Sequence, residues 1–318
     1  MDERSERAAG GDAGGARGVA AGADGGADGP AALRAVAERV AVEAVEHLRT
    51  LPRPWAHAHR LAGAGADVPG APGPGALPGV TTKTSPTDVV TAADTAVEAL
   101  VRARLAQLRP GDPVVGEERG LATGDGAVTW VVDPIDGTVN FLYGLPWYTV
   151  SVAATRDGVS LAGAVAEPET GRLWSAARGG GATCDGRPLR VTDVAELAMT
   201  MVGTGFSYRV ERRTRQAAFV AALLPRVRDV RRSGCATLDA CGVAAGWLDA
   251  YVEHGTNWWD WAASSLIAEE AGAVVRTPPP PGRPAPDDGL GPDALVVAAP
   301  GVAEALTALL RELGAARV

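Results

Sequence analysis

The sequence predicts a mixed α/β fold in which helices alternate with strands around one antiparallel meander. In two stretches, residues 33–51 and 91–108, apolar residues recur at helical spacing, as expected for amphipathic helices. Three strand-like segments separated by short glycine-containing turns predict the meander, at 148–155, 160–167 and 172–177. Strand-like and helix-like segments then alternate to the C-terminus, which is typical of an α/β arrangement.

The remaining elements follow from apolar runs bounded by Gly, Pro and polar residues. Further strands are expected at 113–116, 130–132, 187–191, 199–203, 227–231, 250–253 and 294–298. Further helices are expected at 212–224, 238–246, 261–271 and 302–313, with Gly272 as a C-terminal cap. Residues 1–30 lack large side chains and are expected to form a disordered tail, and residues 52–80 a Pro- and Gly-rich loop. We therefore expect an N-terminal α+β lobe over 31–195 and a C-terminal α/β lobe over 196–318.

Composition excludes several classes of function. The chain has 318 residues and a net charge of −8, so it lacks the excess of Lys and Arg that broad nucleic-acid binding needs. No apolar run approaches the roughly 20 residues of a membrane-spanning helix, and the N-terminus lacks a signal-peptide pattern. The three cysteines match no metal-ligand spacing and are expected to be reduced thiols. We expect a cytoplasmic protein with neither nucleic acid nor membrane as a partner.

The nine residues 132–140, Val-Asp-Pro-Ile-Asp-Gly-Thr-Val-Asn, are the strongest indication of function. They follow an apolar run, so Asp133 and Asp136 are expected where a buried strand breaks into a turn. Pro134 fixes its own φ near about −65° and has no N–H, and Gly137 allows close approach of a ligand. Carboxylates beside a turn that can receive an anion predict a site where hard cations hold a phosphate. The alternative is an acidic loop that only caps a helix.

Five segments, in order, resemble the motifs of the inositol monophosphatase family of metal-dependent, lithium-sensitive phosphatases. They are residues 83–94, 116–118, 133–141, 232–236 and 253–263, the last followed by 270–272. The resemblance runs from about residue 31 to the C-terminus and is greatest to the bacterial, SuhB-type branch. It implies the layered αβαβα fold of that family, a small phosphorylated polyol as substrate, and a homodimer.

The resemblance also implies a site that binds two to three Mg²⁺ ions per subunit. Glu117, Asp133 and the carbonyl of Ile135 would hold the first ion, and Asp133, Asp136 and Asp260 the second. A third, weaker ion would lie near Glu117 and Asp94. The attacking water would be oriented and deprotonated by Asp94 and Thr138, although Asp94 could instead serve only as a helix cap.

Substrate recognition is expected from a further set of residues: Asp136, Gly137, Thr138, Ala236, Glu253 and Asp260. The backbone N–H groups of Gly137 and Thr138 would receive the phosphate at a helix N-terminus. Glu253 precedes Asp260 by seven positions and can accept hydrogen bonds from polyol hydroxyls. Lys83 is either a residue that steers charge or an exposed lysine without a role.

The sequence favours an Mg²⁺-dependent inositol-1-phosphate phosphatase and leaves rivals open. Histidinol-phosphate phosphatase and fructose-1,6-bisphosphatase share the metal ligands, and some family members interact with the transcription machinery. Two departures affect the transfer of roles: the 118–130 loop is short, and three tryptophans crowd the last motif. These tryptophans are expected to be core aromatics, with stacking on the substrate as the alternative. His254 follows Glu253 and either shapes the wall of the pocket or, as we expect, lies at the surface.

Overall fold

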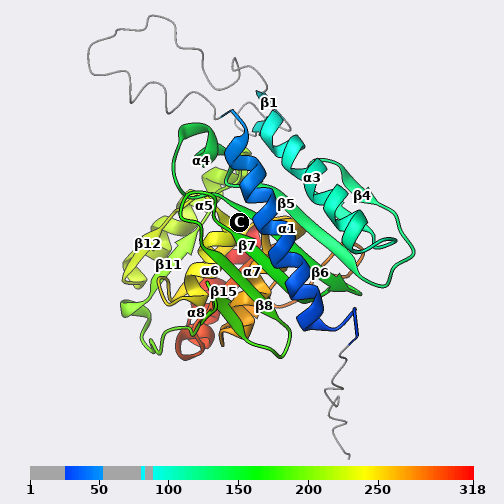
Figure 1. Cartoon of the computed structure of the whole chain (residues 1–318). Helices are drawn as coiled ribbons and strands as arrows, with labels where there is room; N and C mark the ends of the chain where they lie inside the picture. Colours follow the sequence, from blue (N-terminus) through cyan, green and yellow to red (C-terminus); the bar gives the residue numbers. More distant parts are fainter. Residues whose placement is uncertain (1–25, 53–79, 83–88) are drawn as a thin grey trace, which may run out of the picture.

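The computed structural model describes residues 26–52, 80–82 and 89–318, and these form five alternating layers of helix and sheet (Figure 1). The expected loop at 53–79, most of the expected tail and Lys83 lie outside the described residues. The mixed α/β class and the αβαβα layering expected from the sequence are both confirmed.

The larger sheet has eight strands in the order β10-β9-β8-β7-β6-β5-β3-β4. Its strands are β3 (Val114–Gly116), β4 (Gly120–Ala122), β5 (Thr129–Asp136), β6 (Thr149–Arg156), β7 (Val159–Ala166), β8 (Leu173–Ala177), β9 (Ala182–Cys184) and β10 (Arg187–Pro188). β5 to β8 form the expected antiparallel meander, and β3 is the one neighbour that runs parallel to β5. A separate antiparallel pair, β1 (Val80–Thr82) and β2 (Val89–Thr91), leads into the next helix.

Helices α1 (Pro30–Thr50) and α3 (Ala92–Leu108) cover one face of this sheet (Figure 1). Pro30 begins α1, where its missing N–H costs nothing because the first turn has no intrahelical acceptor. α3 begins with a capping box, in which Thr91 and Asp94 satisfy each other's backbone N–H groups. The apolar stripes of both helices are fully buried against β5 to β8, with Leu33, Val40 and Val101 among the residues without solvent exposure.

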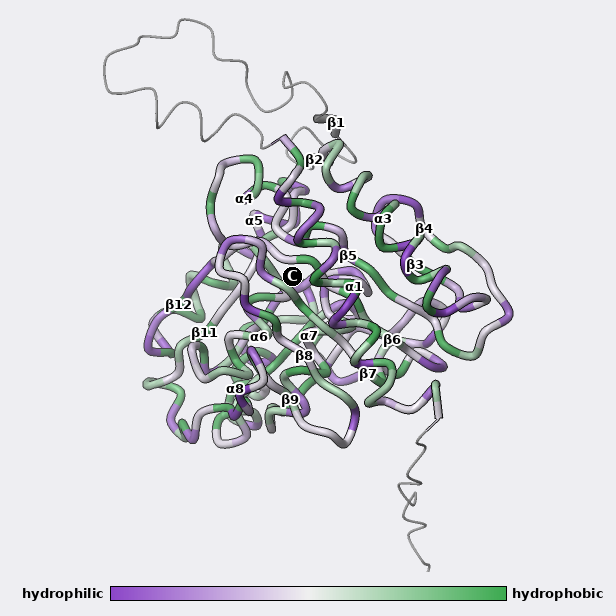
Figure 2. The backbone as a smooth tube through the Cα atoms, viewed as in Figure 1, coloured by the Kyte–Doolittle hydropathy of each residue, from purple (hydrophilic) through white to green (hydrophobic). Residues whose placement is uncertain are grey.

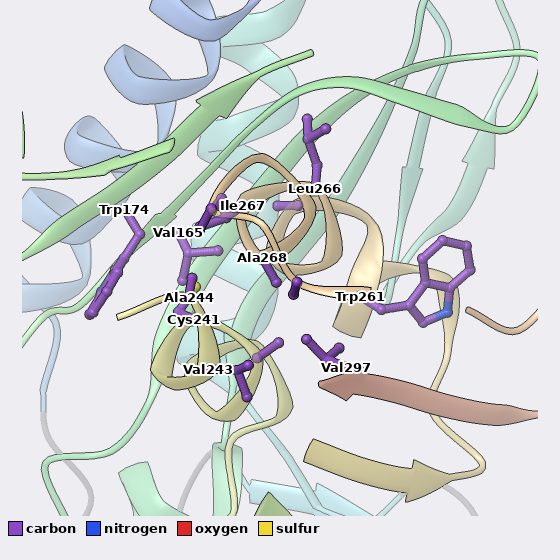
Figure 3. Packing of buried hydrophobic residues seen from close by; sticks show 14 of the residues in the cluster. Val165, Trp174, Cys241, Val243, Ala244, Trp261, Leu266, Ile267, Ala268 and Val297 are labelled. Atoms are coloured by element: carbon purple, nitrogen blue, oxygen red, sulfur yellow. The ribbon is translucent and has the colours of Figure 1, made fainter. Parts of the chain in front are cut away.

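Helices α6 (Ala236–Ala244) and α7 (Trp258–Glu270) form the middle layer between the two sheets. Figure 3 shows α7 in this layer, with Ile267 and Val165 on one side and Val297 of the second sheet on the other. Small residues let these elements approach closely: a Cβ on Gly163 of β7 would lie 2.8 Å from the Cα of Ala263. A helix that is apolar around most of its circumference is buried in this way.

The second sheet has five strands in the order β12-β11-β13-β15-β14. They are β11 (Met201–Thr204), β12 (Asp229–Arg231), β13 (Ala250–His254), β14 (Val274–Arg276) and β15 (Ala294–Ala298), and β11 runs parallel to both neighbours. Helices α5 (Val210–Leu223) and α8 (Pro300–Glu312) pack on its outer face. Short helical turns complete the chain at α4 (Thr138–Tyr143), η2 (Leu197–Met199), η3 (Leu224–Arg226) and η4 (Ala315–Arg317). In Figure 2 the hydrophobic colour gathers in the central strands and helices, while hydrophilic stretches lie toward the periphery.

Two local expectations were wrong. β5 does not end before Asp133: it continues to Asp136 and passes Pro134 through an irregularity in its pairing with β6. Such a bulge accommodates a residue without an N–H and redirects the side chains around it. The expected strand at 187–191 is reduced to the two-residue β10, because Arg187 and Pro188 pair only with the short β9. The strands β4, β9 and β14, each three residues long, were not predicted.

None of the described helices is both long and apolar enough to cross a membrane. The cysteines Cys184, Cys235 and Cys241 form no disulfide, as expected for reduced thiols.

Candidate active site

A cavity of about 850 Å³ opens where the two sheets and the middle helices meet. It is lined by Glu117 beyond β3, by the end of β5 and the start of α4, and by the first residues of α6 and α7. Further lining residues lie in the segments 205–215, 232–235 and 253–257, and Asp293 also lines the cavity. Residues separated by more than 100 positions in sequence therefore converge on one space.

Four of the five predicted carboxylates line this cavity: Glu117, Asp133, Asp136 and Asp260. The fifth, Asp94, lies behind the wall with no solvent exposure and reaches the cavity through Thr138. The Thr138 hydroxyl can donate to Asp94 Oδ1 at 3.2 Å or to the Ile135 carbonyl at 3.0 Å. The other oxygen of Asp94 accepts the N–H and hydroxyl of Thr91, so Asp94 caps α3 and contacts the predicted site at once.

Each of the two carboxylates of β5 accepts hydrogen bonds from the chain through one of its two oxygens. Asp133 is buried and accepts the Ile135 N–H through Oδ1 at 3.0 Å. Asp136 accepts the N–H and the hydroxyl of Thr237 through Oδ2, each at 2.7 Å. Cys235 also donates to that oxygen at 3.2 Å. Asp136 thus caps the N-terminus of α6 from outside the helix and joins the first sheet to the middle layer.

Asp260 and Glu117 complete the acidic wall. Asp260 is the third residue of α7, and its Oδ2 accepts the N–H of Asn257 at 2.6 Å in a capping box. Glu117 is held through its backbone, because its N–H donates to the Val132 carbonyl of β5 at 3.3 Å. Next to it, the fully buried Glu98 of α3 accepts the N–H groups of Glu118 at 2.7 Å and of Arg119 at 3.1 Å.

This concentration of negative charge dominates the electrostatics. Burial, and then the charges of Glu117, Asp136, Asp260 and Asp94, raise the pKa of Asp133 well above its usual value. Burial and the carboxylates of Asp136 and Glu117 likewise raise the pKa of Asp260. Repulsion of this kind is relieved when a cation binds among the groups.

The donor set suits hard divalent cations. Hydrogen bonds among the described residues leave Oδ2 of Asp133 and Oδ1 of both Asp136 and Asp260 without a partner. Within the described part of the chain, no group of three or more His, Cys, Asp or Glu side chains is placed so that it could hold one metal ion. Mg²⁺ does not require such a preformed group, since it keeps several waters in its coordination shell.

The wall beyond the carboxylates carries Glu253, near the end of β13. Its Oε2 accepts the Tyr251 hydroxyl at 2.5 Å, and burial together with the charge of Asp136 raises the pKa of Glu253 to about 7. The neighbouring backbone makes room for this side chain: a Cβ on Gly205 would lie 1.9 Å from Glu253 Oε2. The buried Asp239 of α6 interacts with Glu253, and burial raises the pKa of Asp239 to about 8.

The turn at Gly137 and Thr138, which is predicted to receive the phosphate, is a sharp bend. Gly137 has φ +89°, and a Cβ there would lie 2.9 Å from the Trp147 carbonyl, so glycine is required. Thr138 begins α4, a helix of only six residues. Ala236 lines the cavity as the first residue of α6. The cavity therefore gathers every predicted substrate residue.

Several residues of the site were not predicted. Glu98 supports the segment after Glu117, and Asn140 joins α4 to the 232–236 segment by donating to the Ser233 carbonyl at 2.9 Å. Arg209, Arg212 and Arg215 of the α5 region also line the cavity. The placement of His254 at the surface was wrong: it is buried, its Nε2 lies 3.0 Å from the Leu290 carbonyl, and it lines the cavity, which was the alternative.

The three tryptophans of the last motif differ from one another. Trp261 is buried in the core between the sheets, as expected. Trp258 packs against the same core, and its indole N–H has no partner among the described residues. Trp259 also packs against this core and in addition lines the cavity.

Comparison with known proteins agrees with this geometry. Residues 64–315 match the model of the inositol monophosphatase family. An inositol-1-monophosphatase of Mycobacterium leprae is 52% identical over 288 residues, covering 88% of this chain and 93% of that protein. The inositol-1-monophosphatase SuhB of Mycobacterium tuberculosis is 50% identical over 291 residues, covering 88% and 94%. The solved structure of Mycobacterium tuberculosis SuhB has a TM-score of 0.71 and 43% identity, covering 91% of this chain and 99% of that one.

The chain belongs to the inositol monophosphatase family. The family and the fold implied by the five sequence segments are thereby confirmed, and so is the expectation of an inositol-phosphate phosphatase enzyme.

Proposed function

We propose that this cavity hydrolyses the phosphomonoester of a small polyol, with inositol-1-phosphate as substrate and Mg²⁺ as the required ion. One observation carries the proposal: four carboxylates line a single cavity that also presents Glu253, and three of the four have an oxygen that no hydrogen bond of the described chain uses. The relatives named inositol-1-monophosphatase support the same substrate.

Two cation positions follow from the donor set, and the three carboxylates Asp133, Asp136 and Asp260 define most of them. Glu117, Asp133 and the Ile135 carbonyl would hold one Mg²⁺ ion, and the three aspartates the second. A third ion would bind more weakly near Glu117 and Asp94. When bound, Mg²⁺ neutralises phosphate charge, lowers the pKa of water and stabilises the leaving oxygen.

The chain's own residues supply orientation and proton transfer. Asp94 and Thr138 form a carboxylate–hydroxyl pair at the cavity wall that orients the attacking water and accepts its proton. Asp94 is fixed for this task because its second oxygen is occupied by Thr91. The bend at Gly137 and Thr138 turns backbone N–H groups toward the phosphate. Glu253 and Ala236 face the polyol.

A phosphate-release assay separates the proposed substrate from its rivals. We expect Mg²⁺-dependent release to be fastest with inositol-1-phosphate, compared with histidinol phosphate and fructose-1,6-bisphosphate. Faster release from either of the others would favour the corresponding family activity. Absence of Mg²⁺-dependent release from all three, with a folded protein, would contradict the proposal.

Three further expectations remain predictions: the homodimer, the cytoplasmic location and the alternative role in transcription. Relatives named Nus factor SuhB support the last of these. The one from Xylella fastidiosa is 40% identical over 189 residues, which cover 59% of this chain. The phosphatase is the better supported function, because the cavity brings together the predicted ligands and substrate residues.

A further inference from the structure

Tyr251 places a buried hydroxyl group behind the wall of the cavity that carries Glu253. It lies in β13 two residues before Glu253, so the two side chains lie on the same face of the strand. The Tyr251 ring has no solvent exposure and packs in the core between the sheets. Its hydroxyl donates to Glu253 Oε2 at 2.5 Å. Tyr251 does not itself line the cavity, and the hydrolysis proposed above gives it no task.

Two glycines make room for this hydrogen-bonded pair. In the parallel pairing of β11 with β13, Gly203 lies opposite Tyr251, and a Cβ on Gly203 would lie 3.3 Å from Tyr251 Cδ2. Gly205 follows two residues later and makes room for Glu253 in the same way, since a Cβ there would clash with the carboxylate. The backbone of the neighbouring strand thus limits the positions open to both the ring and the carboxylate.

The surroundings also set the direction of proton donation. Burial, and then the charges of Glu253 and Asp239, raise the pKa of Tyr251 well above its usual value, so its hydroxyl stays protonated and donates. Burial raises the pKa of Glu253 to about 7, and the hydrogen bond from Tyr251 acts in the opposite direction. The hydroxyl therefore favours the ionised form of Glu253, in which both carboxylate oxygens accept hydrogen bonds.

Tyr251 uses only one oxygen of Glu253. Hydrogen bonds among the described residues leave Oε1 without a partner, and Glu253 lines the cavity. A carboxylate that is held at one oxygen cannot rotate freely, so its other oxygen keeps one direction before a substrate arrives. A group ordered in advance loses less conformational entropy when a ligand donates a hydrogen bond to it.

We propose that Tyr251 is a positioning residue for substrate recognition: by holding Oε2 of Glu253, it presents Oε1 to a hydroxyl of the polyol. The inference rests on the proposed phosphatase function and deepens it, because it names a residue on which the preference for a polyol over other phosphate esters depends. Tyr251 contacts neither the substrate nor the reacting atoms. Its effect is therefore confined to substrates that offer a hydroxyl to Glu253.

The variant Tyr251→Phe tests this role, because it removes the hydroxyl and keeps the ring. We expect KM for inositol-1-phosphate to rise about tenfold, as for the loss of one hydrogen bond to a charged group, while kcat changes by less than about twofold. With p-nitrophenyl phosphate, which has no hydroxyl for Glu253 to bind, both constants should stay as in the unmodified enzyme. Hydrolysis of this ester also shows that the variant is folded.

A double-mutant cycle tests whether Tyr251 acts through Glu253. Glu253→Ala leaves no carboxylate to hold, so adding Tyr251→Phe to it should change KM for inositol-1-phosphate by less than about twofold. A further rise as large as the one in the unmodified background would show that Tyr251 acts elsewhere in the fold, and would overturn the inference.

Tyr148→Phe is the matched control. Tyr148 is also buried, its hydroxyl donates to Glu169 Oε1 at the same 2.5 Å, and it does not line the cavity. It should leave the constants for both substrates unchanged. An unchanged KM for inositol-1-phosphate in Tyr251→Phe, equal losses on both substrates, or the same selective loss in Tyr148→Phe overturns this inference while the phosphatase stands. Failure of the unmodified protein to release phosphate from inositol-1-phosphate overturns the proposed function as well.

Discussion

Glu98 is the buried charge on which the position of Glu117 depends. It has no solvent exposure, and it accepts two consecutive backbone N–H groups just after Glu117. Its Oε1 also accepts Arg102 Nε at 2.7 Å, and Arg102 in turn donates to the Val114 carbonyl at 3.2 Å. Gly116 is required beside it, since a Cβ there would lie 2.5 Å from Glu98 Oε1. The ion pair between Glu98 and Arg102 thus holds the backbone of β3 and of the turn that follows it.

Replacing Glu98 with alanine should therefore be strongly destabilising. Removing one partner of a buried ion pair costs about 3–5 kcal/mol, because the other charge is left buried without compensation. Each of the two N–H groups left without an acceptor would cost about 1–3 kcal/mol if it stayed dry. These costs overlap, since water can enter the space vacated, so we expect a loss of about 3–5 kcal/mol in the free energy of unfolding. Glu98→Gln keeps the volume and one acceptor, and should cost about 2–3 kcal/mol.

Urea unfolding followed by tryptophan fluorescence measures this loss. Asp193→Asn is the control, because it breaks an ion pair in which both side chains are largely exposed, and it should leave the midpoint unchanged. A second measurement is the rise in unfolding temperature on adding Mg²⁺, which should be smaller in Glu98→Gln, since Glu117 is then held less firmly. A loss below about 1 kcal/mol, with an unchanged dependence on urea, would refute the reasoning.

Three further predictions concern the carboxylates and one concerns lithium. Asp133→Asn should lower activity by orders of magnitude, and near-normal turnover at saturating Mg²⁺ would contradict the ligand role. The same variant should raise the unfolding temperature of the metal-free protein, because it removes repulsion among buried charges. Asp260→Asn keeps an oxygen that can accept the Asn257 N–H, whereas Asp260→Ala loses it, so the alanine variant should be less stable by about 1 kcal/mol in thermal unfolding. Glu253→Gln should lower kcat/KM for inositol-1-phosphate by roughly one to two decades more than for p-nitrophenyl phosphate. This is the effect expected for the loss of one charge-assisted hydrogen bond. Equal losses on both substrates would show that Glu253 supports the fold or the metal site. Li⁺ should inhibit uncompetitively with respect to substrate, by occupying the weak third cation position; insensitivity at tens of millimolar, an order-of-magnitude figure for such a weak site, would argue against that position.

The sequence predicted the parts of the site that are encoded locally. Asp94 and Asp260 each stand three residues after a capping residue, so the same short patterns that begin α3 and α7 also fix where these carboxylates lie. Gly137 was predicted to allow close approach of a ligand because it lacks a Cβ; the structure adds that its own backbone requires glycine, since its φ is +89°. In each case one short segment contains both the residues that set the local backbone conformation and the residue predicted to act in the site.

The parts that were missed depend on partners far away in the sequence. Glu98 has the spacing of an ordinary surface residue on an amphipathic helix, and only the approach of residues 116–119 makes it a buried anchor. Arg209, Arg212 and Arg215 were not predicted as site residues, because only the folded chain brings the start of α5 to the cavity. His254 was misplaced for the same reason, since the 290–293 segment that covers it follows 36 residues later.

Two of the three predicted ligands of the second cation, Asp136 and Asp260, share an arrangement that explains how several carboxylates can be held close together in a folded protein. Asp136 and Asp260 each place one oxygen on backbone N–H groups at the start of a helix, where the helix dipole favours negative charge. That contact fixes each side chain before a cation arrives, so little conformational entropy remains to be lost on binding. The other oxygen stays in the cavity, where burial and neighbouring carboxylates oppose ionisation, as the raised pKa of Asp260 shows. Cation binding removes this repulsion. Relief of the repulsion among the carboxylates therefore strengthens cation binding. Because the cation binds the folded state, its binding also stabilises the fold.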